Sequence, residues 1–267
     1  MSDSDLTKKY IIPNLKPFFE QMGEMAISLN KSFSKFGKII LQYNDMIEQW
    51  SQRISTIIKP LVDGTIVENY KSSFEEWGNY GWTIIESAPI SLFFEIPQTQ
   101  IDADKIALRY LKKSELELLF KDLYTYKIKK LELDEAIKCF KSSCYKACAM
   151  IVISMIEQKL LNFQDRNGEF DSKKVGGKAV SRFNTYMSNS GGIDEKSIKY
   201  LLYCNITVFL KKLFESANNF KDEPDFLNRN FIMHGMTKKK VRRKDCIKLF
   251  LALKNFLLLS EFYNFKC

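Results

Sequence analysis

One short stretch near the C-terminus holds the residue types that acid–base chemistry on a phosphate requires. The stretch DFLNRNFIMHGMTKKKVRRKD, residues 225–245, contains the only histidine of the chain, His234, with Arg229 five positions before it. An imidazole donates and accepts protons near neutral pH, and a guanidinium holds a phosphate through two parallel hydrogen bonds. On a helix, Asn230 lies four positions before His234 and shares its face. Arg229, Asn230 and His234 are therefore the candidate catalytic residues.

A dense basic run follows the histidine within ten positions. In KKKVRRK, residues 238–244, six of the seven side chains are basic. Neutralisation of phosphates by lysine and arginine supplies much of the affinity of proteins for nucleic acids. We expect the run to hold an RNA backbone beside His234; the alternative is a solvated turn before the last helix. The predicted RNA-binding residues are Lys238, Lys239, Lys240, Arg242, Arg243 and Lys244.

The charge and composition of the whole chain agree with an anionic partner. Its 267 residues include 41 Lys and Arg against 32 Asp and Glu, a formal net charge of +9. Such a charge favours nucleic acid, although many lysine-rich proteins bind none. The polar start MSDSDLTKKY does not look like a secretory signal, and no apolar run approaches the roughly 18 to 20 residues of a membrane span. We expect a cytoplasmic protein with no membrane contact.

Motifs for metal- or cofactor-dependent chemistry are absent from the sequence. There is no P-loop, no GxSxG and no dinucleotide-binding fingerprint. Six cysteines occur without a CxxC pair, and one histidine makes a zinc site unfavourable. Cys144 and Cys148, four apart on one predicted helix, are interpreted as small core residues more readily than as a ligand pair. We expect no metal and no cofactor.

The elements that must position these residues are predicted to be helices. Only six prolines and eleven glycines interrupt segments in which apolar residues recur at spacings of three and four. The fold class expected is all-α. Helices are predicted over about 15–61, 67–86, 102–163 with a break near 124–130, 193–220 and 244–262.

The segments between these helices are predicted to be irregular. Residues 86–102 form a connector in which ISLFFEI is a candidate short strand, and residues 164–196 form a long loop. Pro224 is expected in the first turn of a short helix that ends at His234, with Gly235 as its cap. That helix would carry the candidate catalytic residues.

The site stretch resembles a known family signature. RNFIMH resembles the Arg-x(4 to 6)-His motif of HEPN domains (higher eukaryotes and prokaryotes nucleotide-binding), in the variant in which a polar residue, here Asn230, follows the arginine. The helix AIKCFKSSCYKACAMIVISMIEQKLL looks like the earlier part of such a bundle, in which a Tyr-x-Ala-Ala-like segment leads to an acidic residue. The matching positions are Tyr145, Ala147, Ala149 and Glu157. The resemblance covers about residues 125–265.

The resemblance implies an antiparallel helical bundle over residues 123–267, preceded by an N-terminal helical region of unknown role over residues 1–122. It implies a homodimer in which the arginine and histidine of both copies meet in a cleft. Many members of the family are metal-independent endoribonucleases, often toxins or antiviral defence effectors of abortive infection, and so have an antitoxin or regulatory partner. By position, Arg229 and His234 would be the catalytic pair, Asn230 an auxiliary group, and Glu157 the residue that orients Arg229.

Two other interpretations of the same residues stay open. Some HEPN domains have lost catalysis, so the chain is alternatively a helical module that binds RNA, a nucleotide or a protein without cutting. A purely structural role is the third interpretation, in which Arg229 is locked to Glu157 and His234 is packed in the core. Exposure of Arg229 and His234 separates the third from the first two.

Overall fold

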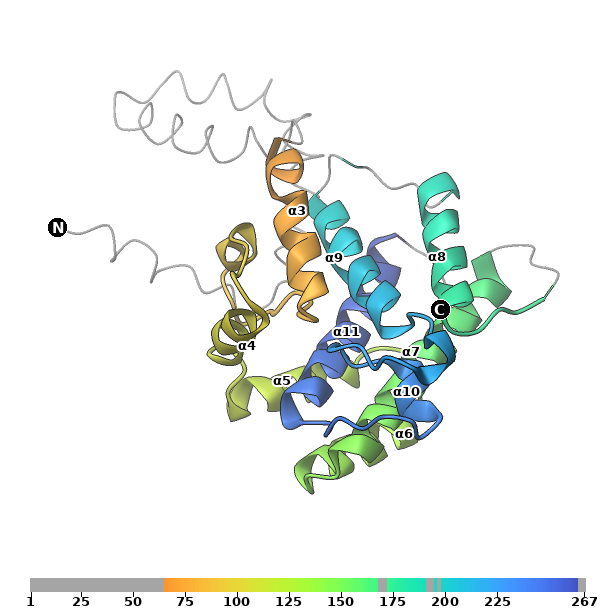
Figure 1. Ribbon diagram of the computed structural model, residues 1–267. Helices are drawn as coiled ribbons and strands as arrows, with labels where there is room; N and C mark the ends of the chain where they lie inside the picture. The colour runs from red at the N-terminus through yellow and green to blue at the C-terminus, as the bar shows by residue number, and fades with distance from the viewer. Residues whose placement is uncertain (1–64, 168–171, 191–194, 196–197, 264–267) are drawn as a thin grey trace, which may run out of the picture.

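The computed structural model describes residues 65–167, 172–190, 195 and 198–263 (Figure 1). These residues are helical or irregular and contain no strand, so the prediction of an all-α fold is confirmed. The long helix predicted over residues 15–61 lies outside the described residues. The α-helices are α3 (Thr65–Asn79), α4 (Gln100–Leu108), α5 (Lys113–Leu123), α6 (Lys130–Lys141), α7 (Tyr145–Asn167), α8 (Gly177–Ser190), α9 (Ile198–Leu213), α10 (Arg229–Met233) and α11 (Arg243–Phe262). Within the described residues there are also two 3-10 helices, η3 (Ile90–Phe94) and η4 (Asn218–Phe220).

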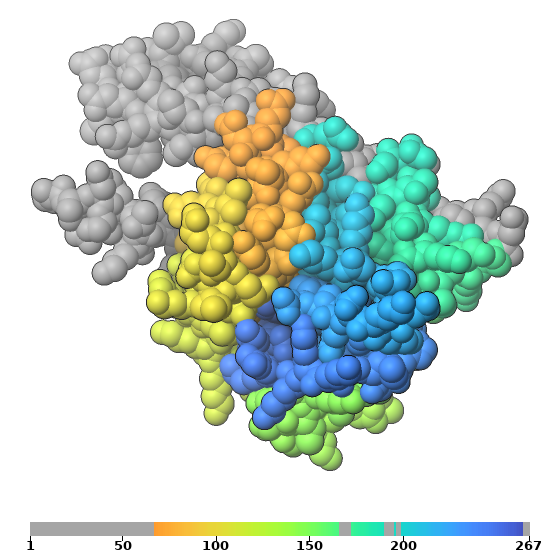
Figure 2. Space-filling view, viewed as in Figure 1, coloured from red at the N-terminus to blue at the C-terminus, as the bar shows by residue number. Residues whose placement is uncertain are grey.

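Helix α11 runs through the middle of the bundle. Every residue from Cys246 to Leu259 is buried. A helix that is apolar around its whole circumference must be enclosed by other elements, and α5, α7 and α9 pack around it (Figure 1). The bundle therefore holds the loop that precedes α11 on a rigid support. Figure 2 shows this loop at the surface, above α6.

Residues 65–123 share this core with the C-terminal helices. Asn205 of α9 is buried and donates its side-chain amide to the backbone oxygens of Phe74 (2.8 Å) and Trp82 (3.1 Å). On α11, the buried Asn255 donates to Thr83 Oγ1 at 2.9 Å. One hydrophobic core thus continues across residue 122, so the part of the N-terminal region that the structure describes does not stand apart. The division into residues 1–122 and 123–267 stays a prediction, because the first 64 residues lie outside the described part of the chain.

The candidate strand ISLFFEI is instead the 3-10 helix η3. Side chains of α3 bind two backbone oxygens at its end, because Ser73 Oγ donates to Phe93 O (2.8 Å) and Trp77 Nε1 donates to Glu95 O (2.9 Å). These two oxygens need no strand partner. The predicted helix over residues 67–86 also ends earlier, at Asn79, where the chain turns through Gly81 with a φ of 79°.

Two predictions about the middle of the chain were wrong. The helix predicted through residues 133–163 is broken between α6 and α7, where Ser143 adopts a φ of 60°. The loop predicted over residues 164–196 contains α8, which buries Phe183 and Met187 on one face. Phe183 packs edge-on against Phe163 of α7, with ring centroids 5.1 Å apart. The apolar spacing of α8 is hidden in the sequence by the glycine, asparagine, serine and lysine residues on its exposed face.

The short helix before His234 is shorter than predicted. α10 contains only the five residues from Arg229 to Met233, and Pro224 precedes it without belonging to it. Gly235 follows with a φ of 71°, a left-handed conformation that glycine adopts without steric cost. The predicted turn at Gly235 is therefore present.

Candidate functional site

The candidate catalytic residues lie on and just after α10, whose start is fixed by Asn228. This side chain is buried, and its Oδ1 accepts hydrogen bonds from the backbone N–H groups of Asn230 (2.9 Å) and Phe231 (3.3 Å). Its Nδ2 donates to the backbone oxygen of Glu215 (3.0 Å). A capping asparagine of this kind satisfies the free N–H groups of the first helical turn. With Phe231 and Ile232 buried beneath it, α10 holds Arg229 and His234 at opposite ends.

Arg229 is held by the buried carboxylate of Glu157 from α7. Its Nη2 lies 3.0 Å and its Nε 3.3 Å from Glu157 Oε2. The other carboxylate oxygen, Oε1, accepts from the backbone N–H of Gly176 at 2.9 Å. The side chains of Arg229 and Glu157 are 19% and 11% exposed, so the pair is largely shielded from water. The structure brings together the two residues that the family resemblance placed in contact.

Asn230 completes the arrangement around the guanidinium. Its Oδ1 accepts from Arg229 Nη1 at 3.1 Å, and its Nδ2 donates to Glu215 O at 2.9 Å. The guanidinium has five N–H bonds, and the hydrogen bonds to Glu157 and Asn230 use one on each nitrogen. One N–H remains on each of Nη1 and Nη2 for a ligand.

His234 ends α10 and is exposed. Its imidazole packs edge-on against Phe220, with ring centroids 5.6 Å apart and an interplanar angle of 69°. Five positions of helix separate it from Arg229, about 7.5 Å of rise. The expected convergence of guanidinium, amide and imidazole is therefore found for Arg229 and Asn230 and not for His234, because the imidazole turns towards η4 and solvent.

Half of the predicted RNA-binding side chains are engaged within the protein. Lys239 pairs with Asp225 (2.8 Å). The guanidinium of Arg243 lies over the ring of Phe140, 5.3 Å from its centroid. Lys244 pairs with the buried Asp104 of α4.

The other half presents its charge to solvent. Lys238, Lys240 and Arg242 are all exposed, and none of the three forms a side-chain ion pair or hydrogen bond with the described part of the chain. Exposed cations without an internal partner keep their full charge for an external anion. These three are the residues of the basic run that best fit the prediction of RNA contact.

Sequence reasoning missed a buried charge cluster beside the basic run. Asp104 pairs with both Lys244 and Lys248, and Lys248 Nζ also lies 4.8 Å from the centre of the Trp82 ring. Burial tends to raise the pKa of Asp104, but the adjacent Lys248 and the hydrogen bond from Lys244 lower it overall. Burial lowers the pKa of Lys248 in spite of its pairing with Asp104. No sequence signal joins these residues, since 140 positions separate Asp104 from Lys244.

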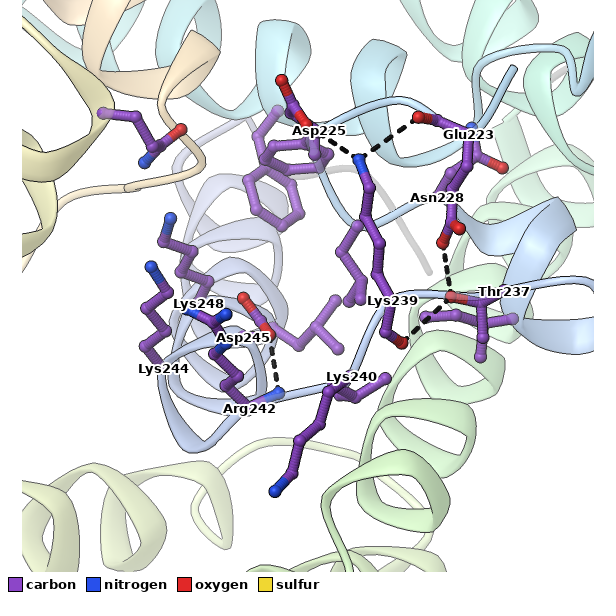
Figure 3. Close-up of a pocket in the computed structure, with 17 residues that line it drawn as sticks. Glu223, Asp225, Asn228, Thr237, Lys239, Lys240, Arg242, Lys244, Asp245 and Lys248 are labelled. Atoms are coloured by element: carbon purple, nitrogen blue, oxygen red, sulfur yellow. Dashed lines mark hydrogen bonds and ion pairs between the residues drawn. The ribbon is translucent and has the colours of Figure 1, made fainter.

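A cavity of about 420 Å³ opens between the basic run, α9 and the segment before α10 (Figure 3). Neither Arg229 nor His234 lines it. Lys239 reaches across it from the basic run to the segment 223–225 (Figure 3), donating to the backbone oxygens of Glu223 (3.2 Å) and Pro224 (3.0 Å). This cavity beside the basic run is thus separate from the candidate catalytic pair.

Cys144 and Cys148 differ in their surroundings. Cys144 precedes α7 and is exposed, whereas Cys148 is buried. Only Cys148 is therefore the core residue that was expected, and the two do not share a helix face. A hydrogen bond with Cys148, together with burial, raises the pKa of the Cys246 thiol.

Over the residues that the structure describes, no group of three or more His, Cys, Asp or Glu side chains is placed to bind a metal ion. Within the same residues, no helix combines the length and the apolar character needed to cross a membrane.

Comparisons of the chain with models of protein families, with curated protein sequences and with solved structures found no match. The resemblance to HEPN domains rests on the residues quoted above.

Proposed function

We propose that the chain is a metal-independent endoribonuclease of the HEPN type, acting on cytoplasmic RNA. The observation that supports it best is that the Arg229 guanidinium is held in place while part of it stays available to a ligand. Glu157 and Asn230 hold it in one orientation and leave two N–H bonds unused, beside a helix end that exposes the single imidazole of the chain. Fixed donors of this kind are what stabilise charge on a phosphate during transfer.

In the proposed reaction the 2′-hydroxyl of a ribose attacks the adjacent phosphorus. A base removes the 2′-hydroxyl proton, the bond from phosphorus to the 5′-oxygen breaks, and an acid protonates that leaving oxygen. The products are a 2′,3′-cyclic phosphate and a 5′-hydroxyl. His234 moves the protons, and the free N–H groups of Arg229 bind the non-bridging phosphate oxygens.

The need for both a base and an acid supports a homodimer. Each copy has one histidine, and two copies bring two imidazoles to one scissile bond. In this proposal the exposed imidazole of one copy lies in a cleft with the Arg229 of the other, so the separation of His234 from Arg229 within one copy is no obstacle. A toxin or abortive-infection role, with an antitoxin or regulatory partner, follows from the family resemblance.

A second candidate function is a binding module without catalysis. It is favoured by the same ion pair, because Glu157 neutralises Arg229, and by the lining of the cavity beside the basic run, which does not include His234. Such a module binds RNA with an affinity that falls steeply with salt and leaves the RNA intact.

Cleavage of a mixed RNA substrate in EDTA separates the two candidates. The wild-type protein is expected to produce fragments with 2′,3′-cyclic phosphate ends, and the His234→Ala variant is expected to produce none. His234 is exposed, so this substitution leaves the core intact and circular dichroism provides the check. Equal cleavage by both proteins would refute the assignment of His234, and RNA binding without cleavage by either would support the binding module.

A further inference from the structure

The cavity beside the basic run is lined by two chemically different kinds of side chain. The apolar ones are Phe209, Phe226, Leu227, Ile232, Val241 and Leu249. The charged ones are five basic and three acidic side chains. Its volume of about 420 Å³ falls in the range of roughly 300 to 1,000 Å³ that small-molecule sites occupy. A ligand that fills it must therefore combine an apolar part with a charged part.

The acidic side chains of the cavity are already satisfied by the protein. Glu223 accepts hydrogen bonds from the Thr237 hydroxyl and from the backbone N–H of Lys238 (2.8 Å). Asp225 pairs with Lys239, and Asp245 accepts from the backbone N–H of Arg242 (2.7 Å). A carboxylate that already accepts hydrogen bonds in this way binds a further cation only weakly. The cavity therefore does not suit a cationic ligand.

Several basic side chains of the cavity keep N–H groups that no other group in the described part of the chain uses. Lys240 and Arg242 are exposed and form no side-chain ion pair within the described residues. Lys244 shares the single carboxylate of Asp104 with Lys248. Figure 3 shows Arg242, Lys244 and Lys248 along one side of the cavity, with Lys240 at its lower edge. The Lys240 side chain points away from this group, so the neighbouring Arg242 and Lys244 supply the free N–H donors for a phosphate.

Phe226 offers an aromatic surface for a planar ring. It is half-buried and packs edge-on against the buried Phe209, with ring centroids 5.4 Å apart. A Cβ at Gly81 would lie 2.4 Å from Phe226 Cε2, so the ring also packs closely on the backbone at Gly81. Planar bases stack on aromatic side chains of this kind.

We propose that this cavity is a binding site for a nucleotide, with the phosphate held by Arg242 and Lys244 and the base placed against Phe226. A free mononucleotide and one nucleotide of an RNA strand share this chemistry. The site is distinct from the candidate catalytic pair, because neither Arg229 nor His234 lines it. It would exist whether or not the chain cleaves RNA.

Isothermal titration of the full chain at low salt with AMP, adenosine and inorganic phosphate tests the proposal. AMP carries both a base and a phosphate, so it is expected to bind at least tenfold more tightly than adenosine or phosphate. The double variant Arg242→Ala/Lys244→Ala is expected to weaken AMP binding at least about tenfold, since it lacks two charged hydrogen-bond donors. Adenosine binding should change little in the same variant.

Lys221→Ala provides the matched control. Lys221 is an exposed lysine that belongs neither to the basic run nor to the lining of the cavity. Its AMP affinity is expected to stay within about twofold of the wild type. An equal loss in the control and in the double variant would overturn the proposal, as would AMP binding that the double variant does not weaken or no AMP binding at millimolar concentration.

A further titration with a six-nucleotide RNA identifies the source of the nucleotide. Binding of the RNA at least tenfold tighter than AMP, abolished in the double variant, would assign the cavity to an RNA strand. Comparable binding would assign it to a free nucleotide. The His234→Ala variant should bind AMP as the wild type does, so loss of cleavage and loss of this site are measured separately.

Discussion

The guanidinium of Arg229 and the carboxylate of Glu157 form an ion pair at 3.0 Å although 72 positions separate them in the sequence. Through its second oxygen, Glu157 also binds the backbone N–H of Gly176, just before α8. One carboxylate thus ties α10 to α7 and to the start of α8. The orientation of Arg229 depends on this buried residue and on Asn230.

Glu157→Gln is expected to reduce both stability and cleavage. The amide keeps the shape of the side chain but loses its charge, so the free energy of unfolding should fall by about 1 to 3 kcal/mol. If Arg229 acts on the phosphate, kcat should fall at least tenfold with a smaller change in KM, because a mobile guanidinium stabilises the transition state less well. Urea denaturation and RNA cleavage in EDTA measure the two effects.

Glu132→Gln is the control for this substitution. Glu132 pairs with Lys129 within one exposed turn, where such pairs contribute roughly 0 to 1 kcal/mol. Neither stability nor cleavage should change beyond that range. A Glu157→Gln protein as stable and as active as the control would mean that the ion pair positions nothing.

The Asp104 cluster gives a second prediction. Asp104→Asn leaves Lys248 buried beside Trp82 without its carboxylate, and an unpaired buried charge costs about 3 kcal/mol. Trp82 Nε1 donates to Asp104 Oδ1 at 2.9 Å, so the asparagine keeps a hydrogen bond and the loss is mainly electrostatic. Urea denaturation at neutral pH should show the decrease.

The pH dependence of stability has a definite sign. The pKa of Asp104 is lowered in the folded protein, against the effect of burial, by Lys248 and Lys244. Its contribution is therefore fully present above the unfolded carboxyl pKa of about 3.9 and is lost as the pH falls through the lower folded value. The difference in unfolding free energy between wild type and Asp104→Asn should shrink in that acidic range; a constant difference would exclude this role of the carboxylate.

Local features of this site were accessible from the sequence, and long-range ones were not. The turn at Gly235 follows from adjacent residues, and the contact between Arg229 and Glu157 was expected from the family resemblance. The pairing of Asp104 with Lys244 spans 140 positions, and no periodicity encodes it. The direction of the His234 imidazole also escaped prediction, because η4 supplies Phe220 as its neighbour from an irregular segment.

The close approach of α3 and α9 gives a third prediction. A Cβ at Gly78 would lie 2.5 Å from the backbone oxygen of Asn205, so Gly78→Ala forces the two helices apart. Overpacking of this kind costs about 1 to 3 kcal/mol, more than alanine gains over glycine within a helix. Thermal denaturation should show the loss, whereas Ser72→Ala, at an exposed position of the same helix, should be close to neutral. A stable Gly78→Ala protein would mean that residues 65–79 pack more loosely on α9.

RNA binding should depend unequally on the six residues of the basic run. Lys238, Lys240 and Arg242 are exposed and form no side-chain ion pair within the described residues, whereas Lys239, Arg243 and Lys244 already contact Asp225, Phe140 and Asp104. For a single strand, removing one cation that neutralises a phosphate reduces the steepness of the fall of log Kobs with log salt by about 0.7. The triple variant Lys238→Ala/Lys240→Ala/Arg242→Ala should therefore reduce the steepness of this slope by about 2, measured by fluorescence anisotropy with a labelled single-stranded RNA.

The matched variant Lys239→Ala/Arg243→Ala should reduce the steepness of the slope by less than about 1 unit. Equal slopes for the wild type and the triple variant would place the RNA on another face of the molecule.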